Sequence, residues 1–144
     1  MPDCDTIISM KTVLIVDDVS FVRKTLAKIL TDARYHVVGE AEDGVQAVTQ
    51  YFKLKPDIVT MDVVMPKMSG IDATRKIISQ DKNANIVIIS AMGQESLVME
   101  AINAGAKDYI LKPFSEQDII KTVEHALTSE EQLTQRSSFK EQAR

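Results

Sequence analysis

The chain has 144 residues, 44% of them hydrophobic and 26% charged, which predicts one globular domain that buries roughly 68–70% of its unfolded surface. Its formal net charge of −4 argues against binding to nucleic acid, which would need a basic patch. The lone Cys4, with no apolar run long enough to span a membrane and no signal peptide, predicts a cytoplasmic protein without membrane insertion.

The chain opens with MPDCDTIISM, which we expect to be a flexible leader over residues 1–10. After it, short β-branched runs alternate with segments of helical spacing. The expected strands are residues 12–16, 36–41, 58–61, 86–90 and 109–111. Parallel strands joined by right-handed helical crossovers predict an α/β fold, a doubly wound (βα)5 five-stranded parallel sheet in a flavodoxin-like, three-layer sandwich.

The helices are predicted from apolar side chains that recur every three or four positions. These stripes are Val22, Leu26, Ile29 and Leu30; Ala47, Val48, Tyr51 and Phe52; Ile71, Thr74, Ile77 and Ile78; Leu97, Val98, Ala101 and Ile102; and Ile119, Ile120, Val123, Ala126 and Leu127. Asp43 with Gln46 has the spacing of a capping box, and Ser115 with Asp118 is a weaker relative of it. Gly105 follows the fourth helix where a C-terminal glycine belongs.

The domain is expected to cover residues 11–128. The polar C-terminal tail, residues 129–144, either extends the last helix or is disordered.

Four apolar runs, VLIV, IVTM, IVII and YIL, lead into polar residues, and these are Asp17 and Asp18, Asp62, Ser90, and Lys112. Ligands of open α/β sheets bind beyond the carboxyl ends of the strands, so we expect these side chains to meet at one edge. Taken singly, each has an ordinary explanation as a helix cap, a turn residue, a strand-end hydroxyl or a solvated lysine. Their shared position in the alternating pattern favours a cation-and-phosphate site.

The chemistry of this set suits phosphoryl transfer. Two carboxylates about 4 Å apart repel by about 4 kcal/mol at an effective dielectric constant of roughly 20, so a cation is needed. Oxygen ligands without nearby histidine or cysteine favour Mg²⁺ or Mn²⁺. Asp62 is the most plausible nucleophile, because a carboxylate can form an acyl phosphate, while Lys112 and Ser90 can contact the new phosphate oxygens.

The motifs VLIVDD, DIVTMDVVMPKMSG, IVIISA and AGAKDYILKPF stand in this order. Through them residues 11–127 resemble the receiver domain of two-component response regulators, and within that family the stand-alone chemotaxis proteins of the CheY type. The resemblance implies the strand order 2-1-3-4-5. It also implies that Asp62 is the phosphoacceptor of a histidine kinase, and that the protein is a phosphoacceptor signalling protein with autocatalysed phosphoryl transfer, not an enzyme.

The same resemblance implies how the metal is held. Asp18 and Asp62 would bind Mg²⁺ directly together with the backbone carbonyl of Val64, and Asp17 would act largely through a bound water.

The resemblance further implies a switch. Ser90 and Lys112 would grip the phosphate, the loop 91–95 would follow Ser90, and Tyr109 would rotate inward. The bond before Pro113 is expected to be cis. We expect the fourth helix, fifth strand and fifth helix to form the partner-binding face, and the fourth helix carries more apolar residues than one buried stripe holds, so Val98 or Met99 is expected at the surface.

Two positions that influence acyl-phosphate hydrolysis in this family are apolar here, Val64 and Met92. Neither side chain can orient a water molecule, which predicts slow autodephosphorylation and a separate phosphatase.

We expect the downstream target to be a protein, and the flagellar switch of chemotaxis is the favoured candidate. We expect a monomer, and phosphorylation-dependent dimerisation stays open. A phosphorelay intermediate, or a receiver that controls another output, is the alternative. A haloacid-dehalogenase-like phosphatase fits less well, because its DxDx(T/V) motif would follow the first strand, where residues 17–20 read DDVS. A flavodoxin-like flavin binder would need a phosphate-cradling loop after that strand, and the sequence lacks one there.

Overall fold

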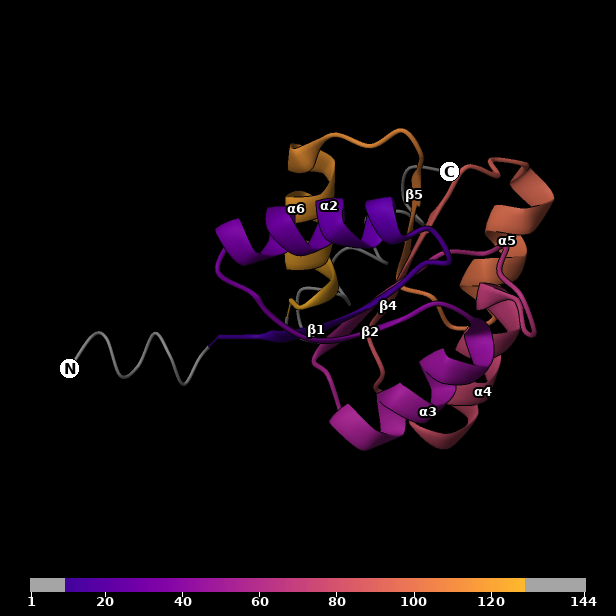
Figure 1. Cartoon of the computed structure of the whole chain (residues 1–144). Helices are drawn as coiled ribbons and strands as arrows, with labels where there is room; N and C mark the ends of the chain where they lie inside the picture. The colour runs from indigo at the N-terminus through magenta and orange to yellow at the C-terminus, as the bar shows by residue number, and fades with distance from the viewer. Residues whose placement is uncertain (1–9, 129–144) are drawn as a thin grey trace.

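The computed structural model describes residues 10–128, so the predicted tail and nearly all of the predicted leader lie outside the described residues. Strands and helices alternate along the chain (Figure 1), in the order β1 (Thr12–Val16), α2 (Ser20–Asp32), β2 (His36–Ala41), α3 (Gly44–Leu54), β3 (Ile58–Met61), α4 (Gly70–Gln80), β4 (Ile86–Ser90), α5 (Glu95–Asn103), β5 (Asp108–Leu111) and α6 (Glu116–Ala126). The predicted strand bounds are confirmed, except that β5 begins one residue earlier.

All strand pairs are parallel, and the sheet order is β2-β1-β3-β4-β5, as the resemblance implied. The chain therefore leaves β1 toward one edge of the sheet, through β2, and returns to build the other half from β3 onward. The switch point lies between β1 and β3, where open α/β sheets bind their ligands.

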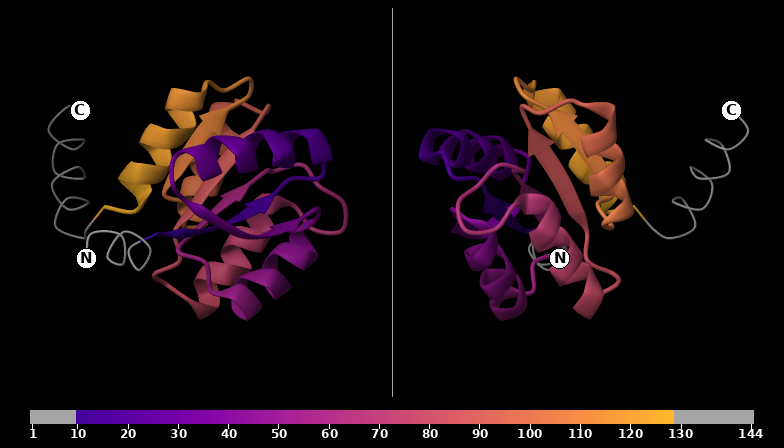
Figure 2. Two further views of the ribbon diagram at one scale, coloured as in Figure 1. Left: turned by 60° about the vertical axis from the view of Figure 1, so that its left-hand side comes forward. Right: turned by 90° about the vertical axis from the view of Figure 1, so that its right-hand side faces the viewer.

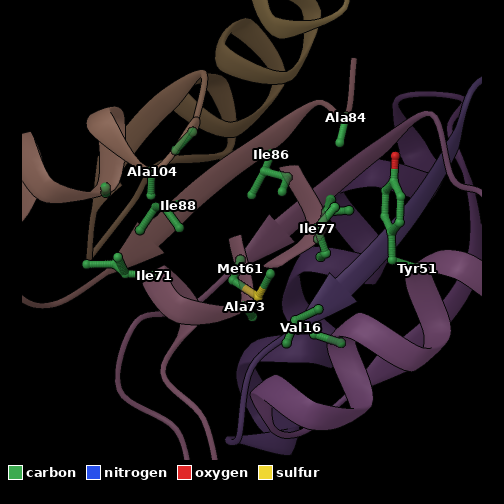
Figure 3. Packing of buried hydrophobic residues seen from close by; sticks show 14 of the residues in the cluster. Val16, Tyr51, Met61, Ile71, Ala73, Ile77, Ala84, Ile86, Ile88 and Ala104 are labelled. Atoms are coloured by element: carbon green, nitrogen blue, oxygen red, sulfur yellow. The ribbon is translucent and has the colours of Figure 1, made fainter. Parts of the chain in front are cut away.

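The sheet is covered on both faces (Figure 2), by α2 and α6 on one side and by α3, α4 and α5 on the other. Alternate residues of β1 show this, since Val13 and Ile15 pack with the α2/α6 layer while Leu14 and Val16 pack with the other layer. Figure 3 shows the hydrophobic core between the sheet and the layer of α3, α4 and α5, in which Tyr51 and Ile77 pack near the strands. No helix within residues 10–128 is both long and apolar enough to cross a bilayer.

The helix ends follow the local sequence. Asp43 accepts a hydrogen bond from the Gln46 amide at 2.8 Å, while the Gln46 side chain accepts from Glu42, so this predicted box is only half formed. Ser115 and Asp118 make the complete capping box. Gly105 has a φ of +115°, a left-handed conformation that glycine adopts without strain.

The stripe predicted for α5 is wrong at Ile102, which is 39% exposed, whereas Ala101 is fully buried. This helix lies near the β5 edge of the sheet and covers it mainly through Ala101 and Leu97. Because the sheet ends there, Ile102, the next apolar position along the helix, stays partly exposed to solvent. Met99, at 51% exposed, reaches the surface as predicted.

Candidate functional site

The acidic residues predicted at the strand ends do converge. The Asp62 amide donates to the Val16 carbonyl at 3.0 Å, which continues the pairing of β3 with β1 and places Asp62 beside Asp17. Carboxylate oxygens of Asp17, Asp18 and Asp62 all lie within 4.8 Å of one another. Asp17 and Asp62 are buried while Asp18 is exposed, so the cluster opens to solvent on one side.

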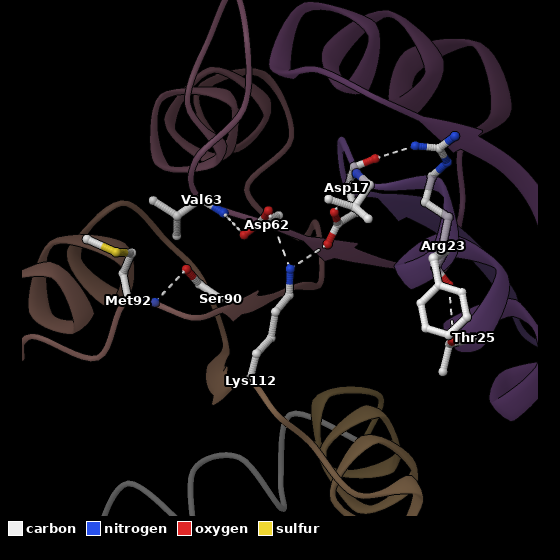
Figure 4. Close-up of polar contacts among 10 residues, drawn as sticks. Asp17, Arg23, Thr25, Asp62, Val63, Ser90, Met92 and Lys112 are labelled. Carbon is white, nitrogen blue, oxygen red and sulfur yellow. Dashed lines mark hydrogen bonds and ion pairs between the residues drawn. The ribbon is translucent and has the colours of Figure 1, made fainter.

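Lys112 reaches across from the end of β5 and lies between the two buried acids (Figure 4). Its Nζ is 2.7 Å from Asp17 Oδ2 and 3.5 Å from Asp62 Oδ2. One ammonium group therefore offsets part of the repulsion between two carboxylates. The Lys112–Pro113 peptide bond is cis, as predicted.

The protonation equilibria reflect this crowding. Burial raises the pKa of the Asp62 carboxyl, and the Asp17 carboxylate adds to the rise, although Lys112 and the Val63 amide oppose it. Burial on its own would lower the pKa of Lys112, but its contacts with Asp17 and Asp62 outweigh that, so the net pKa is raised. An ion pair alone would lower the pKa of Asp62, and its rise shows that desolvation by the surrounding core dominates at this carboxyl.

Ser90 and Tyr109 are joined through one loop. The Ser90 hydroxyl accepts a hydrogen bond from the Met92 amide at 3.1 Å (Figure 4). The Tyr109 hydroxyl donates to the Met92 carbonyl. Burial raises the pKa of Tyr109, the Ser90 hydroxyl lowers it, and the Asp62 charge raises it further. The half-buried tyrosine is thus in contact with the segment that connects the site to α5.

Arg23 was missed by the sequence reasoning. Its Nη1 donates to the Asp17 carbonyl at 2.6 Å, and its Nε donates to Glu40 Oε1 at 2.9 Å. The guanidinium thereby ties β2 and α2 to the backbone of a site residue. The only signal in the sequence was an arginine six positions after Asp17, on the first turns of a helix, which also describes many solvated arginines.

The donor set fits a hard divalent cation. Three carboxylates with one solvent-exposed member, and neither histidine nor cysteine among them, are typical of Mg²⁺ or Mn²⁺ sites rather than zinc sites. The Val64 side chain is exposed. That its backbone carbonyl completes the ligand set, and that Asp17 acts through water, stay predictions.

Comparison with known proteins agrees with this geometry. The family model of the response regulator receiver domain matches residues 13–124. The chain is 54% identical over 113 residues to the chemotaxis protein CheY of Thermotoga maritima, covering 78% of this chain and 94% of that protein. It is 47% identical over 115 residues to CheY of Bacillus subtilis, covering 80% of this chain and 96% of that protein.

Solved structures give the same result. A crystal structure of the CheX–CheY–BeF3–Mg²⁺ complex from Borrelia burgdorferi matches with a TM-score of 0.81 and 39% identity, over 83% of this chain and 90% of that one. The receiver domain of CheB from Thermotoga maritima matches with a TM-score of 0.72 and 33% identity, over 81% of this chain and 93% of that one.

Proposed function

Since this chain belongs to the family of response regulator receiver domains, we propose that Asp62 is its phosphoacceptor and that a histidine kinase supplies the phosphoryl group. The protein is a CheY-type response regulator of chemotaxis, which works as a phosphoacceptor and not by enzymatic turnover of a substrate. The observation that carries the proposal is the Asp62 carboxylate, held beside Asp17 and within 3.5 Å of the Lys112 ammonium.

The side chains around Asp62 have separate roles in this proposal. Attack by a carboxylate oxygen on phosphorus forms an acyl phosphate while the bond to the donor breaks. Lys112 already contacts the Asp62 carboxylate and would stabilise the added charge, about −1.5 to −2 at neutral pH. The Ser90 hydroxyl, which can donate as well as accept, would turn from the Met92 amide toward a phosphate oxygen.

We propose Mg²⁺, or Mn²⁺ in its place, as the cofactor, held by Asp18, Asp62 and the Val64 carbonyl, with Asp17 acting through a water molecule. The relative from Borrelia burgdorferi was crystallised with Mg²⁺. A bound divalent cation would neutralise charge that develops on the phosphoryl oxygens.

The switch is proposed to pass through the loop after β4. If Ser90 turns toward a phosphate, the Met92 amide loses its acceptor, and the loop that also receives the Tyr109 hydroxyl must rearrange. Near this loop the surface carries Met92, Met99, Ile102 and Leu111 as exposed apolar side chains. We therefore assign partner binding to the face formed by α5, β5 and α6, where methionines suit an adaptable contact.

The receiver domain is proposed to cover residues 11–128 and to act in the cytoplasm, which the single cysteine of the chain suits. Its proposed partners are a histidine kinase, a downstream target such as a flagellar switch protein, and a separate phosphatase. The proposal of a separate protein partner of this kind is supported by the relative from Borrelia burgdorferi, which was crystallised in complex with CheX.

The test is labelling by acetyl phosphate in the presence of Mg²⁺. We expect the wild-type protein to gain one hydroxylamine-sensitive phosphoryl group, because an acyl phosphate is cleaved by hydroxylamine, and we expect Asp62→Asn to stay unlabelled. Asp72→Asn is the matched control, since Asp72 is an exposed aspartate on α4 and should label normally. A label on Asp62→Asn would refute the assignment.

A further inference from the structure

Gly70, the first residue of α4, lies directly against the phosphoacceptor's backbone. A Cβ atom on Gly70 would be 1.8 Å from the Asp62 carbonyl oxygen and 2.9 Å from Met61 Cγ. Real Cβ atoms essentially never approach a heavy atom closer than 3.0 Å, and here the nearest atom is backbone, which cannot swing away. Only glycine leaves room for this helix to begin where it does.

Further contacts fix the same junction. The Gly70 amide donates to the Val63 carbonyl at 2.8 Å, which closes the loop after Asp62 into a compact turn. The Thr74 hydroxyl donates to the Gly70 carbonyl at 2.7 Å and is fully buried. Met68, farther along this loop, packs against Gly44 at the start of α3. A Cβ on Gly44 would be 2.3 Å from the Met68 carbonyl oxygen, so a glycine is needed there as well.

We propose that Gly70 is a positioning residue for phosphorylation, setting the Asp62 main chain so that its carboxylate faces Asp17 and Lys112. The proposal rests on the proposed function of Asp62. To restore an ordinary contact, an added methyl group must push Asp62 or α4 so that the distance grows from 1.8 Å to at least 3.4 Å, a shift of roughly 1.6 Å. A misplacement of only about 1 Å can already cost on the order of 10²-fold in rate. Because the Asp62 carboxylate also accepts from the Val63 amide, displacing this backbone turns the carboxylate as well.

The experiment compares Gly70→Ala with Gly39→Ala. Gly39 lies on the edge strand β2, where an added Cβ would be 2.6 Å from Leu54 Cδ1, the end of a flexible side chain, and in ordinary contact with Leu14 Cδ1 at 3.6 Å. The initial rate of labelling by acetyl phosphate is measured at saturating Mg²⁺, at a temperature where circular dichroism shows each variant fully folded. We expect Gly70→Ala to label at least tenfold more slowly than wild type, and Gly39→Ala to stay within twofold.

A merely structural role for Gly70 would lower the unfolding midpoint and leave the rate per folded molecule unchanged, and that result would overturn the proposal. Failure of the wild type to label would instead refute the role of Asp62. If Gly70→Ala does not fold, Thr74→Val tests the same junction, because it removes the hydroxyl that holds the Gly70 carbonyl without adding volume. We then expect labelling about threefold slower than wild type, and an unchanged rate would overturn the proposal.

Discussion

Asp62 combines burial with a like charge beside it, and this arrangement predicts that the stability of the fold depends on pH. Its folded-state pKa is raised, by burial first and also by Asp17, so the folded protein holds the proton more tightly than the unfolded chain does. The free energy of unfolding therefore falls as pH rises through the unfolded-state and then the folded-state pKa of this carboxyl. The whole penalty is present once the pH exceeds the folded-state pKa.

The first prediction follows from this penalty. In metal-free buffer at pH 7.5, Asp62→Asn should unfold at a higher temperature than wild type, because a neutral amide escapes the desolvation cost. The gap should shrink as pH falls through the raised folded-state pKa of Asp62, and it should be closed below the ordinary carboxyl pKa of about 3.9, where this carboxyl is neutral in both the folded and the unfolded state. Thermal unfolding followed by circular dichroism measures it, with Asp72→Asn as the exposed control. Equal midpoints at pH 7.5 would contradict the prediction.

Thr60 gives a second prediction. Among residues 10–128, its Oγ1 is the only buried side-chain nitrogen or oxygen without a hydrogen-bond partner. A buried unsatisfied hydroxyl costs about 1–3 kcal/mol, so Thr60→Val should raise the free energy of unfolding by about 1 kcal/mol. Thr74→Val is the control with the opposite sign, since the Thr74 hydroxyl is bonded to Gly70, and it should lose about 1 kcal/mol. Urea unfolding measures both, and a destabilised Thr60→Val would show that this hydroxyl finds a partner.

At the level of the elements, β1, β3, β4 and β5 were predictable because each contains a short apolar run that leads into a charged or hydroxyl residue. The position of Lys112 between Asp17 and Asp62 was predictable only as a convergence at one edge, not as a pairing. The contact of Arg23 with the Asp17 carbonyl and the packing of Gly70 against the Asp62 carbonyl were not predictable from the sequence. Both depend on how closely two segments approach in the fold, which residue spacing along the chain does not specify. Ile102 was misplaced because periodicity cannot tell where a sheet ends.

The loop between β4 and α5 carries the third prediction. Tyr109→Phe keeps the ring but removes the hydroxyl that donates to the Met92 carbonyl, so the loop loses one of its ties to β5. We expect amide hydrogen exchange in residues 91–95 to accelerate by roughly fivefold, as the loss of about 1 kcal/mol implies. Labelling by acetyl phosphate should stay within twofold of wild type.

Tyr51→Phe is the matched control for this loop. It also loses one tyrosine hydrogen bond, to Asp81 at 2.6 Å, but that bond joins α3 to the end of α4. Exchange in residues 91–95 should therefore not change. Equal protection of the loop in Tyr109→Phe and wild type would show that the hydroxyl does not restrain it.

For the whole molecule, the strand order came from resemblance to a family, because alternation of strands and helices alone allows several orders. The same resemblance supplied the switch and the cis bond, while the chemistry of the carboxylates followed from the residues themselves. By the same resemblance, the residues at positions 64 and 92 are predicted to set the lifetime of the phosphorylated state. Val64 and Met92 are both exposed and apolar, so neither can position a water molecule for attack.

The fourth prediction concerns that timescale. Val64→Asn should shorten the lifetime of the acyl phosphate by about tenfold, because an amide can orient the attacking water, although it is no general base. Decay of the label after removal of the donor measures the lifetime. Val45→Asn, at an exposed valine on α3, should leave it unchanged. A lifetime of seconds in the wild-type protein would overturn the expectation that a separate phosphatase is required.

The pairing of Asp17 with Lys112 spans 95 positions along the chain, and Lys112 directly follows β5, the last strand in the sequence. During synthesis on the ribosome, both acids emerge well before the ammonium group that balances them. A chain that stops short of β5 would therefore hold the proposed acceptor Asp62 without Lys112, the ammonium group that contacts its carboxylate. On the proposed function, a chain truncated before β5 is therefore expected not to accept a phosphoryl group.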